Sequence, residues 1–543
     1  MLFKTYGYAV NGIDAIKIIV ETNITQGINF FMVGLPDSAV KESQQRIQAA
    51  LKNIDYRMPG KQITINMAPA DIRKEGSAYD LTIAIGILAA SEQIKISAAD
   101  DSVIMGELAL DGTVRPIKGA LPIAIKSKKD GFRKLFLPAE NAHESAIVEG
   151  IEVYPIENIK QLIDYFNGEQ NIEPLRINIQ DLFLQKLNEY DLDFADVKGQ
   201  QNIKRSLEIA AAGGHNVILI GPPGAGKTML SKRLPSILPP LTLEEALETT
   251  KIHSVAGKVG KNIGLITQRP FRSPHHTISD VALVGGGNNP QPGEISLAHN
   301  GVLFLDELPE FKRSVLEVLR QPLEDRVVTI SRAKFSVQYP ASFMLVASMN
   351  PCPCGYYNHP EKECVCTPSM VQKYLSKISG PLMDRIDLHV EVVPVNFEEL
   401  SSRHIPSENS KHIRERVMKA RNIQTQRFKN KEGIYCNAQM RSNEIKEYCQ
   451  LDDTGTKILK TAMEKLQLSA RAYDRILKVA RTIADLDNSE NILAAHVAEA
   501  VHYRSLDRQN CQTSKWNLPF LSALFFFFIF IFILTISKVK FTP

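Results

Sequence analysis

The sequence predicts a multidomain α/β protein with an α+β domain at its N-terminus, a parallel-sheet core in the middle and a helical domain at its C-terminus. The chain has 543 residues, which is more than one hydrophobic core usually supports. Strand–loop–helix units occupy its middle part, and beyond residue 396 charged amphipathic stretches replace them. We expect domain boundaries where these patterns change.

The bulk composition is that of an ordinary globular protein. The hydrophobic content is 44%, the charged content is 23% and the formal net charge is +4, so overall charge neither requires nor excludes a nucleic-acid partner. The N-terminus lacks the pattern of a signal peptide, and seven cysteines in a long chain do not resemble a secreted disulfide framework. We therefore expect a cytoplasmic protein.

The first 165 residues mix two kinds of segment. Residues 63–67 have the pattern of a strand, whereas residues 81–88 form an apolar helical run. Turn residues separate such segments, so an α+β domain is predicted over residues 1–165. The polar stretch 166–191 is predicted to be a linker.

The middle and final parts of the chain differ in the spacing of their apolar residues. Short apolar strands are predicted at residues 216–220, 301–305 and 343–347, each followed by a loop, which favours a parallel α/β sheet over residues 192–396. Amphipathic stretches around residues 413–427 and 458–486 predict a helical lid over residues 397–509.

A phosphate-binding loop directly follows the first of these strands. It fits the pattern G-x-x-x-x-G-K-[S/T] with Gly221, Pro222, Pro223, Gly224, Ala225, Gly226, Lys227 and Thr228. Glycines let backbone N–H groups approach phosphates, and the helix N-terminus adds a favourable dipole. We predict that Lys227 contacts the β- and γ-phosphates and that Thr228 holds Mg²⁺, with ATP as the ligand.

Polar residues end the two later strands. Asp306 is predicted to join the Mg²⁺ shell and Glu307 to polarise the attacking water. Asn350 is predicted to orient that water or to sense the γ-phosphate. Such residues are common at strand ends, but their positions after the phosphate loop favour one nucleotide site.

Three arginines are candidates for remote roles. Arg385 is predicted to act as an arginine finger on a neighbouring subunit, which implies a ring; the alternative is an ion pair with Asp384 or Asp387. Arg471 and Arg475 lie four residues apart on one predicted helix face. Arg471 is predicted to be a second nucleotide sensor, and Arg475 its partner or a solvated charge.

Four cysteines lie within the insertion 352–366, and their spacing predicts a metal site. Four thiolates suit tetrahedral Zn²⁺. Reduced structural thiols and a redox pair are the alternatives. A bound metal would either brace the strand that ends at Asn350 or project a rigid knob toward a partner. The cysteines are Cys352, Cys354, Cys364 and Cys366.

Two segments are candidates for contacts to DNA phosphates, a sequence-independent and salt-sensitive interaction. One carries Arg269 and Arg272. The other, residues 326–335, has the pattern of a β-hairpin with Arg332 and Lys334 near its tip. Solvated surface charges are the alternative for both segments.

The tail over residues 510–543 is atypical. Residues 518–536 carry no charge and are flanked by lysines, which is the pattern of a membrane-spanning helix. The alternative is a sequence artefact, such as a reading-frame error. We leave the tail out of the functional prediction.

Taken together, residues 1–509 resemble the AAA+ ATPases of the magnesium-chelatase-like family, in its YifB/ComM branch. The most specific stretches are residues 269–276, 285–287, 292–299 and 349–355. The resemblance implies a homo-hexameric, DNA-dependent ATPase and helicase that drives branch migration of DNA junctions. A magnesium-chelatase ATPase subunit and a protein-remodelling ATPase are the alternatives.

The N-terminal domain resembles the proteolytic domain of Lon proteases but departs from it at both catalytic positions. Ala78 stands where the family has its nucleophilic serine, with Ser77 one position early, and Leu121 stands where it has its lysine. A serine–lysine dyad needs both groups. We therefore expect no peptidase activity, and a role as a scaffold or a DNA-facing ring.

Overall fold

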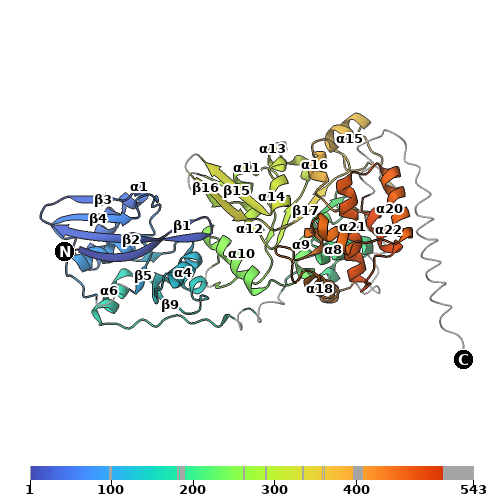
Figure 1. The fold of residues 1–543 in the computed structure, drawn as a ribbon. Coiled ribbons are helices and arrows are strands. Elements are labelled where there is room, and N and C mark those ends of the chain that lie inside the picture. Colours follow the sequence, from blue (N-terminus) through green and yellow to red (C-terminus); the bar gives the residue numbers. More distant parts are fainter. Residues whose placement is uncertain are drawn as a thin grey trace, which may run out of the picture.

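The computed structural model describes residues 2–96, 101–179, 183, 190–260, 263–287, 290–332, 335–357, 359, 361–394 and 408–504. Its three parts follow one another along an elongated molecule, with the N-terminal sheets at one end and the helical domain at the other (Figure 1). Within these ranges, no helix combines the length and the apolar character needed to cross a membrane. The tail 510–543 lies outside them.

The N-terminal domain is built on a four-stranded sheet of order β1-β2-β4-β3 and a parallel three-stranded sheet of order β5-β8-β9. Helix α3 is buried at every position, which accounts for its almost entirely apolar sequence, interrupted only by Asp80 and Thr82. The strands are β1 (Leu2–Asn11), β2 (Asp14–Thr25), β3 (Phe30–Val33), β4 (Gln62–Ala68), β5 (Ser102–Ile104), β6 (Glu107–Leu108), β7 (Val114–Arg115), β8 (Lys134–Pro138) and β9 (Glu152–Ile156). The helices are α1 (Ser38–Lys41), α2 (Ser43–Asn53), α3 (Asp80–Ala90), α4 (Ala120–Lys129), α5 (Ala139–Ser145) and α6 (Ile159–Asn167).

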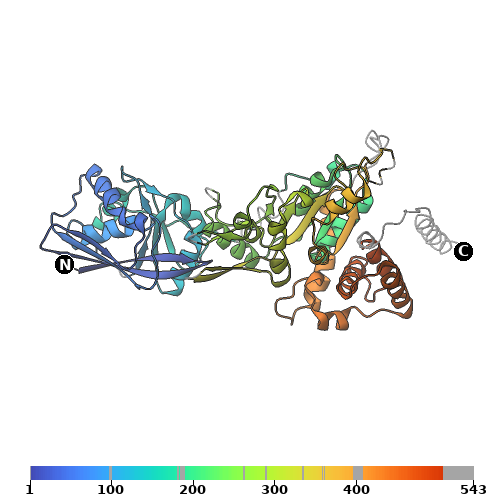
Figure 2. The same cartoon turned by 90° about the horizontal axis from the view of Figure 1, so that it is seen from above.

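The N-terminal domain docks on the central domain through α4. The backbone N–H of Leu121 donates to Ser254 Oγ (3.3 Å), and the Leu121 side chain is buried in one apolar cluster with Ala246 and Leu265. At the tip of the long β1–β2 hairpin, Ile13 packs against the cluster that contains Val337 of β16 (Figure 2). The two domains therefore share buried apolar surface at two places.

The central domain contains a five-stranded parallel sheet of order β11-β14-β17-β10-β18. The three strands expected from the sequence, β10, β14 and β17, are present. The strands of this domain are β10 (Val217–Ile220), β11 (Phe271–Arg272), β12 (Gly285–Gly286), β13 (Gln291–Pro292), β14 (Val302–Leu305), β15 (Val327–Arg332), β16 (Phe335–Pro340), β17 (Met344–Met349) and β18 (Leu388–Glu391). The helices are α8 (Gln201–Gly213), α9 (Lys227–Arg233), α10 (Leu243–Val255), α11 (Asp280–Val284), α12 (Glu294–Leu297), α13 (Arg313–Glu317), α14 (Arg320–Asp325), α15 (Pro368–Leu375) and α16 (Gly380–Met383).

The predicted charged hairpin is the antiparallel pair β15–β16, which projects from this domain beside the N-terminal hairpin (Figures 1 and 2). Lys334 and the side chain of Arg332 lie outside the described part of the molecule.

The C-terminal domain is helical, as predicted, but residues 458–486 form two helices instead of one. Gln467 adopts a left-handed conformation (φ +50°) that ends α20, and the Ser469 side chain accepts a hydrogen bond from the Ala472 N–H to cap α21. The helices are α18 (Ser410–Arg427), α19 (Ser442–Tyr448), α20 (Asp453–Leu466), α21 (Ala470–Leu486) and α22 (Ala494–His502).

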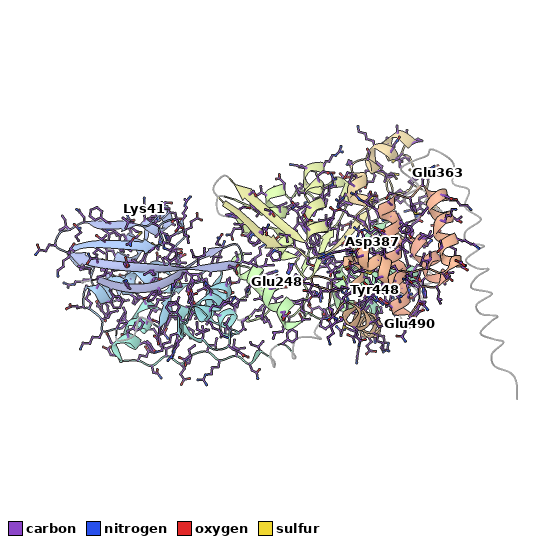
Figure 3. All side chains as sticks on the ribbon, viewed as in Figure 1. Lys41, Glu248, Glu363, Asp387, Tyr448 and Glu490 are labelled. Atoms are coloured by element: carbon purple, nitrogen blue, oxygen red, sulfur yellow. The ribbon has the colours of Figure 1, made fainter. Side chains whose placement is uncertain are left out.

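A buried carboxylate joins this helical domain to the central sheet. Asp387, labelled in Figure 3, is 1% exposed and accepts hydrogen bonds from Arg475 of α21 (2.9 Å) and from the Asn216 N–H (3.0 Å). Burial by itself would raise the pKa of Asp387, but Arg475 and then His215 outweigh it and pull the pKa well below its ordinary value. Arg475 is therefore a structural ion-pair partner and not a solvated charge.

Replacing Arg475 is expected to destabilise the protein far more than replacing its neighbour on the same helix face. Arg475→Met leaves Asp387 buried without its main partner, a loss of about 3 kcal/mol. Arg471 is 62% exposed, so Arg471→Met should change the free energy of unfolding by less than about 0.5 kcal/mol. Urea unfolding at pH 7 measures both values.

The difference in unfolding free energy between Arg475→Met and Arg471→Met should become smaller as the pH falls. Because the folded-state pKa of Asp387 is depressed, the contribution of the pair is complete above the unfolded carboxyl pKa of about 4 and declines as the pH falls below it. Equal stabilities of the two variants at pH 7 would contradict this account of the domain junction.

Candidate active site

The phosphate loop connects the end of β10 to the start of α9, and its glycines are required by its shape. Gly224 and Gly226 have φ of +80° and +84°, where other residues are strained. A Cβ atom on Gly221 would lie 2.3 Å from the carbonyl oxygen of Val392. The loop is therefore a closely fitted backbone cradle at the edge of the sheet.

Lys227 is 9% exposed and lies across this cradle. Its Nζ donates to the carbonyl oxygens of Gly221 (2.7 Å) and Pro222 (2.9 Å) and to Asn350 Oδ1 (3.1 Å). Burial lowers the pKa of Lys227, an effect that the carboxylates of Asp306 and Glu307 oppose. The amine is held where a phosphate oxygen can take over its hydrogen bonds.

Asp306 is fixed by two hydroxyl groups from different elements. Thr228 Oγ1 donates to one carboxylate oxygen (2.7 Å), and Ser348 Oγ donates to the other. Hydroxyl and carboxylate oxygens are the ligands that Mg²⁺ prefers in proteins. The pair Thr228 and Asp306 therefore fits the predicted metal role.

Ser348 was not among the residues predicted from the sequence. A signal was available, because Ser348 lies near the end of β17, which ends at Met349, and two residues before Asn350.

Glu307 has a different environment from Asp306. It takes a left-handed backbone conformation (φ +53°), and its side chain is 58% exposed. His276 Nδ1 lies 3.6 Å from Glu307 Oε2. His276 belongs to the stretch 269–276, which contains β11, so the structure brings the end of that stretch to the carboxylate predicted to polarise water. The position of His276 could not be derived from its sequence spacing.

A further residue missed from the sequence is Gln200. Its Nε2 donates to the carbonyl oxygen of Ala225 (2.8 Å) in the phosphate loop. Gln200 Oε1 is buried and has no hydrogen-bond partner among the described residues. It is an acceptor beside the loop that a ligand can use.

The two remote arginines lie apart from the phosphate loop's contacts. Arg385 is 8% exposed and pairs with Glu324 (2.6 Å), not with Asp384 or Asp387 as in the alternative interpretation. Arg471 faces Asp384 at 4.0 Å. Among the contacts of the described residues, none joins either arginine to the loop 221–228. Their nucleotide roles stay predictions.

The structure gives Arg269 a role different from the DNA contact predicted for it. Its guanidinium donates to the carbonyl oxygens of Pro239 and Asn300 and pairs with Glu245 (3.0 Å). The side chain is only 14% exposed, because it ties the start of α10 to β14. These contacts occupy most of the guanidinium and weaken the case for Arg269 as a DNA contact, which stays a prediction.

Arg272 is also engaged, although less completely. Its Nε and one terminal nitrogen both bond Glu294, at 2.6 and 2.9 Å. This bidentate pair, 31% exposed on the arginine side, weakens the case for DNA contact.

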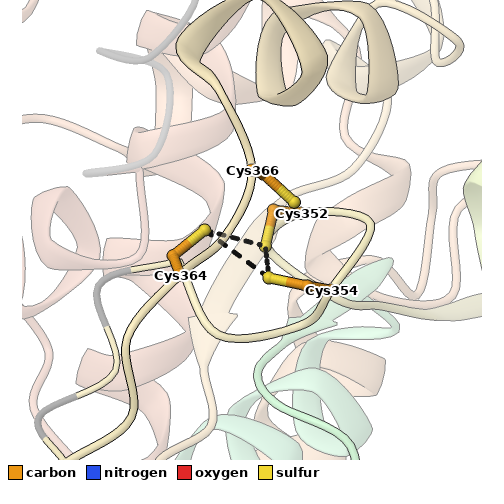
Figure 4. A group of neighbouring side chains, drawn as sticks. All are labelled: Cys352, Cys354, Cys364 and Cys366. Atoms are coloured by element: carbon orange, nitrogen blue, oxygen red, sulfur yellow. Dashed lines mark hydrogen bonds between the residues drawn. The ribbon is translucent and has the colours of Figure 1, made fainter.

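The four cysteines predicted to bind metal come together (Figure 4). The sulfur atom of Cys352 lies 3.3 Å from that of Cys354 and 3.7 Å from that of Cys364, and the last two are 3.5 Å apart. With Cys366 included, all four sulfur atoms lie within 4.8 Å of one another. They are free thiols and form no disulfide.

Three family models match this chain in the order of its domains. "Subunit ChlI of Mg-chelatase" matches residues 20–141, "Magnesium chelatase, subunit ChlI" matches residues 193–400, and the model of the ChlI C-terminal region matches residues 407–504. Competence protein ComM of Haemophilus influenzae is 43% identical over 504 residues, which cover 93% of this chain and 97% of that protein. The chain belongs to the ComM/YifB-type magnesium-chelatase-like family.

Two further relatives match different shares of this chain. The uncharacterized protein YifB of Escherichia coli is 45% identical over 505 residues, covering 92% of this chain and 96% of that protein. Lon protease 2 of Bacillus subtilis is 30% identical over 148 residues, about 26% of each chain. Membership of the ComM/YifB-type family suggests an AAA+ ATPase that uses ATP and Mg²⁺.

Replacing the two adjacent carboxylates is expected to change turnover and nucleotide binding in different ways. Asp306→Asn should abolish Mg²⁺-dependent turnover and weaken Mg²⁺–nucleotide binding, because it removes charge from the metal shell. Glu307→Gln should keep nucleotide binding but lower kcat by about 10²–10⁴, as expected for loss of a general base. Turnover and binding of a fluorescent ATP analogue separate the two. Full turnover of Glu307→Gln would contradict the assignment.

Proposed function

We propose that this protein is an ATP hydrolase that works as a ring-shaped DNA motor, a branch-migration helicase acting in recombination or natural transformation. The observation that carries the proposal is the connected set of hydrogen bonds that joins Lys227 to Asn350 and Thr228 to Asp306. These residues come from three different segments and meet at one sheet edge. The name of the Haemophilus influenzae relative, a competence protein, supports the biological setting.

ATP and Mg²⁺ fit the residues present. Lys227 and the loop N–H groups would hold the phosphates, and Thr228 with Asp306 would hold Mg²⁺, which supplies charge neutralisation when bound. Asn350 and the exposed Glu307 would orient and polarise the attacking water. The exposure of Glu307 is consistent with this role, since its carboxylate is open toward solvent.

Completion of the site from a neighbouring subunit is part of the proposal. Stabilisation of the transition state needs a positive charge that Lys227 alone does not supply, and an arginine finger is worth about 10³–10⁵ in rate. Arg385 is the proposed finger and Arg471 a second nucleotide sensor. In the proposed homo-hexamer each Arg385 would reach the next subunit's nucleotide after its pair with Glu324 opens.

DNA contact is assigned to the hairpin β15–β16. Arg332 and Lys334 are the proposed phosphate contacts, and Arg272 is a weaker candidate because Glu294 already binds it. Salt-dependent backbone contacts suit a motor that moves along any sequence.

The second candidate is an ATPase subunit of a magnesium chelatase, which the descriptions of the matching family models favour. Turnover stimulated by protoporphyrin with partner subunits, and not by DNA, would select it. A protein-remodelling protease is disfavoured: Leu121, at the position of a Lon lysine, is buried against Leu265 of the central domain. Peptide cleavage abolished by mutating Ser77 would revive it.

The decisive experiment measures ATP turnover of the full chain and of a chain ending at Gln509, alone and with single-stranded or four-way DNA. The proposal expects stimulation by DNA and movement of the junction. Absence of both effects would exclude the DNA motor. The shortened chain tests whether the tail contributes.

Arg385→Ala should retain nucleotide binding and lose hydrolysis by about 10³ or more. Lys227→Ala should lose both, because it removes the amine that bridges the loop and Asn350. Mixing Arg385→Ala with Lys227→Ala subunits should restore part of the turnover if the finger acts between subunits. Full turnover of Arg385→Ala alone would contradict the ring.

A further inference from the structure

We infer that Cys352, Cys354, Cys364 and Cys366 form a structural Zn²⁺ site that holds the phosphate loop in its nucleotide-binding shape. The inference rests on the proposed ATP site and adds a second metal with a positioning role. It is carried by two observations, the geometry of the sulfur atoms and the contact between the cysteine segment and the loop.

The sulfur geometry matches a tetrahedral thiolate site. Four ligands about 2.3 Å from Zn²⁺ stand about 3.8 Å from one another. The three closest sulfur pairs are 3.3, 3.5 and 3.7 Å apart, and all four atoms lie within 4.8 Å. A disulfide would bring two sulfur atoms to about 2.05 Å. The arrangement therefore suits one metal ion better than a redox pair.

The cysteine segment begins at the active site. Cys352 is two residues beyond Asn350 and is completely buried. Asn350 accepts a hydrogen bond from Lys227 (3.1 Å), and Met349, just before it, accepts one from the Gly221 N–H (3.2 Å). The first pair of cysteines is thus a direct continuation of the strand that contacts the phosphate loop.

Gly355 brings the cysteine segment itself against that loop. Its N–H donates to the Cys352 carbonyl oxygen (3.0 Å) in a turn, and its φ is +85°. A Cβ atom on Gly355 would lie 2.5 Å from Cδ of Pro223, so the backbone of the cysteine segment lies against the second proline of the loop. The metal site is therefore turned inward as a brace and is not only a knob for a partner.

The physical reason for a metal here is chain entropy. The described residues of the segment 352–366, which leave out 358 and 360, form no helix or strand, so few of their backbone hydrogen bonds restrict the segment. A metal bound to the four cysteines closes this segment and lowers its conformational entropy. The contact between Gly355 and Pro223 alone does not close the segment. With the segment ordered, Gly355 and Asn350 are held against Pro223 and Lys227 before the nucleotide arrives.

Removing a ligand on the far arm tests the site without touching the contact. Cys364→Ser leaves residues 350–355 unchanged but breaks the ligand set. We expect zinc content to fall from one ion per chain to near zero and affinity for a fluorescent ATP analogue to weaken about tenfold, measured without DNA.

Changing the contact while leaving the ligands tests the coupling. Gly355→Ala should keep one zinc per chain and also weaken nucleotide affinity about tenfold, since its methyl group would displace Pro223. Gly131→Ala is the matched control: Gly131 has φ +90°, and its added Cβ meets no atom within 4 Å. It should retain both zinc and wild-type affinity.

The outcomes are distinct. Wild-type protein that binds no zinc after growth or reconstitution with Zn²⁺ would overturn the metal site. If the wild-type protein holds zinc, Cys364→Ser loses it and nucleotide affinity is unchanged in both Cys364→Ser and Gly355→Ala, the brace is overturned while the ATP site stays intact. Wild-type protein that holds zinc but binds no nucleotide would overturn the proposed function together with the coupling.

Discussion

The hydrogen bond from Thr228 to Asp306 is the contact on which the active site depends, because it joins residues 78 positions apart on different elements. It requires β10 and β14 to end at the same edge of the sheet with β17 between them. The central strand then reaches both sides: Ser348 holds Asp306, and Asn350 holds Lys227. Parallel strand order thus creates a continuous polar network at one edge.

The opposite edge of this sheet, where the strands begin, is held by buried charge. Asp387 lies just before β18, next to the phosphate-loop strand in the sheet, and binds Arg475 of the helical domain. Since an unpaired carboxylate there would be costly, the helical domain is held in one position relative to the sheet. The N-terminal domain is attached differently, through apolar contacts at α4 and at the tip of the β1–β2 hairpin. A polar junction therefore holds the helical domain against the central domain, and apolar junctions hold the N-terminal domain.

Local patterns predicted much of the candidate site. The residues Lys227, Thr228, Asp306 and Asn350 were identified from their places after apolar strands, and the structure brings them into hydrogen-bond contact. These contacts form because parallel strands place their carboxyl ends together whatever the intervening loops do. The sequence did not predict that Arg269 pairs with Glu245 and with carbonyl groups of other segments. A charge pattern gives no information about such distant partners.

What the sequence alone determined is the chemistry: a glycine loop with the phosphate-binding pattern, carboxylates at strand ends and four thiols with metal spacing. These depend on residue types and short spacings, which local geometry converts directly into structure. Only the tertiary structure decided that His276 meets Glu307, that Glu324 holds Arg385 and that Gly355 lies against Pro223. Those contacts join segments from separate loops and helices, and packing, not sequence spacing, sets the distance between them.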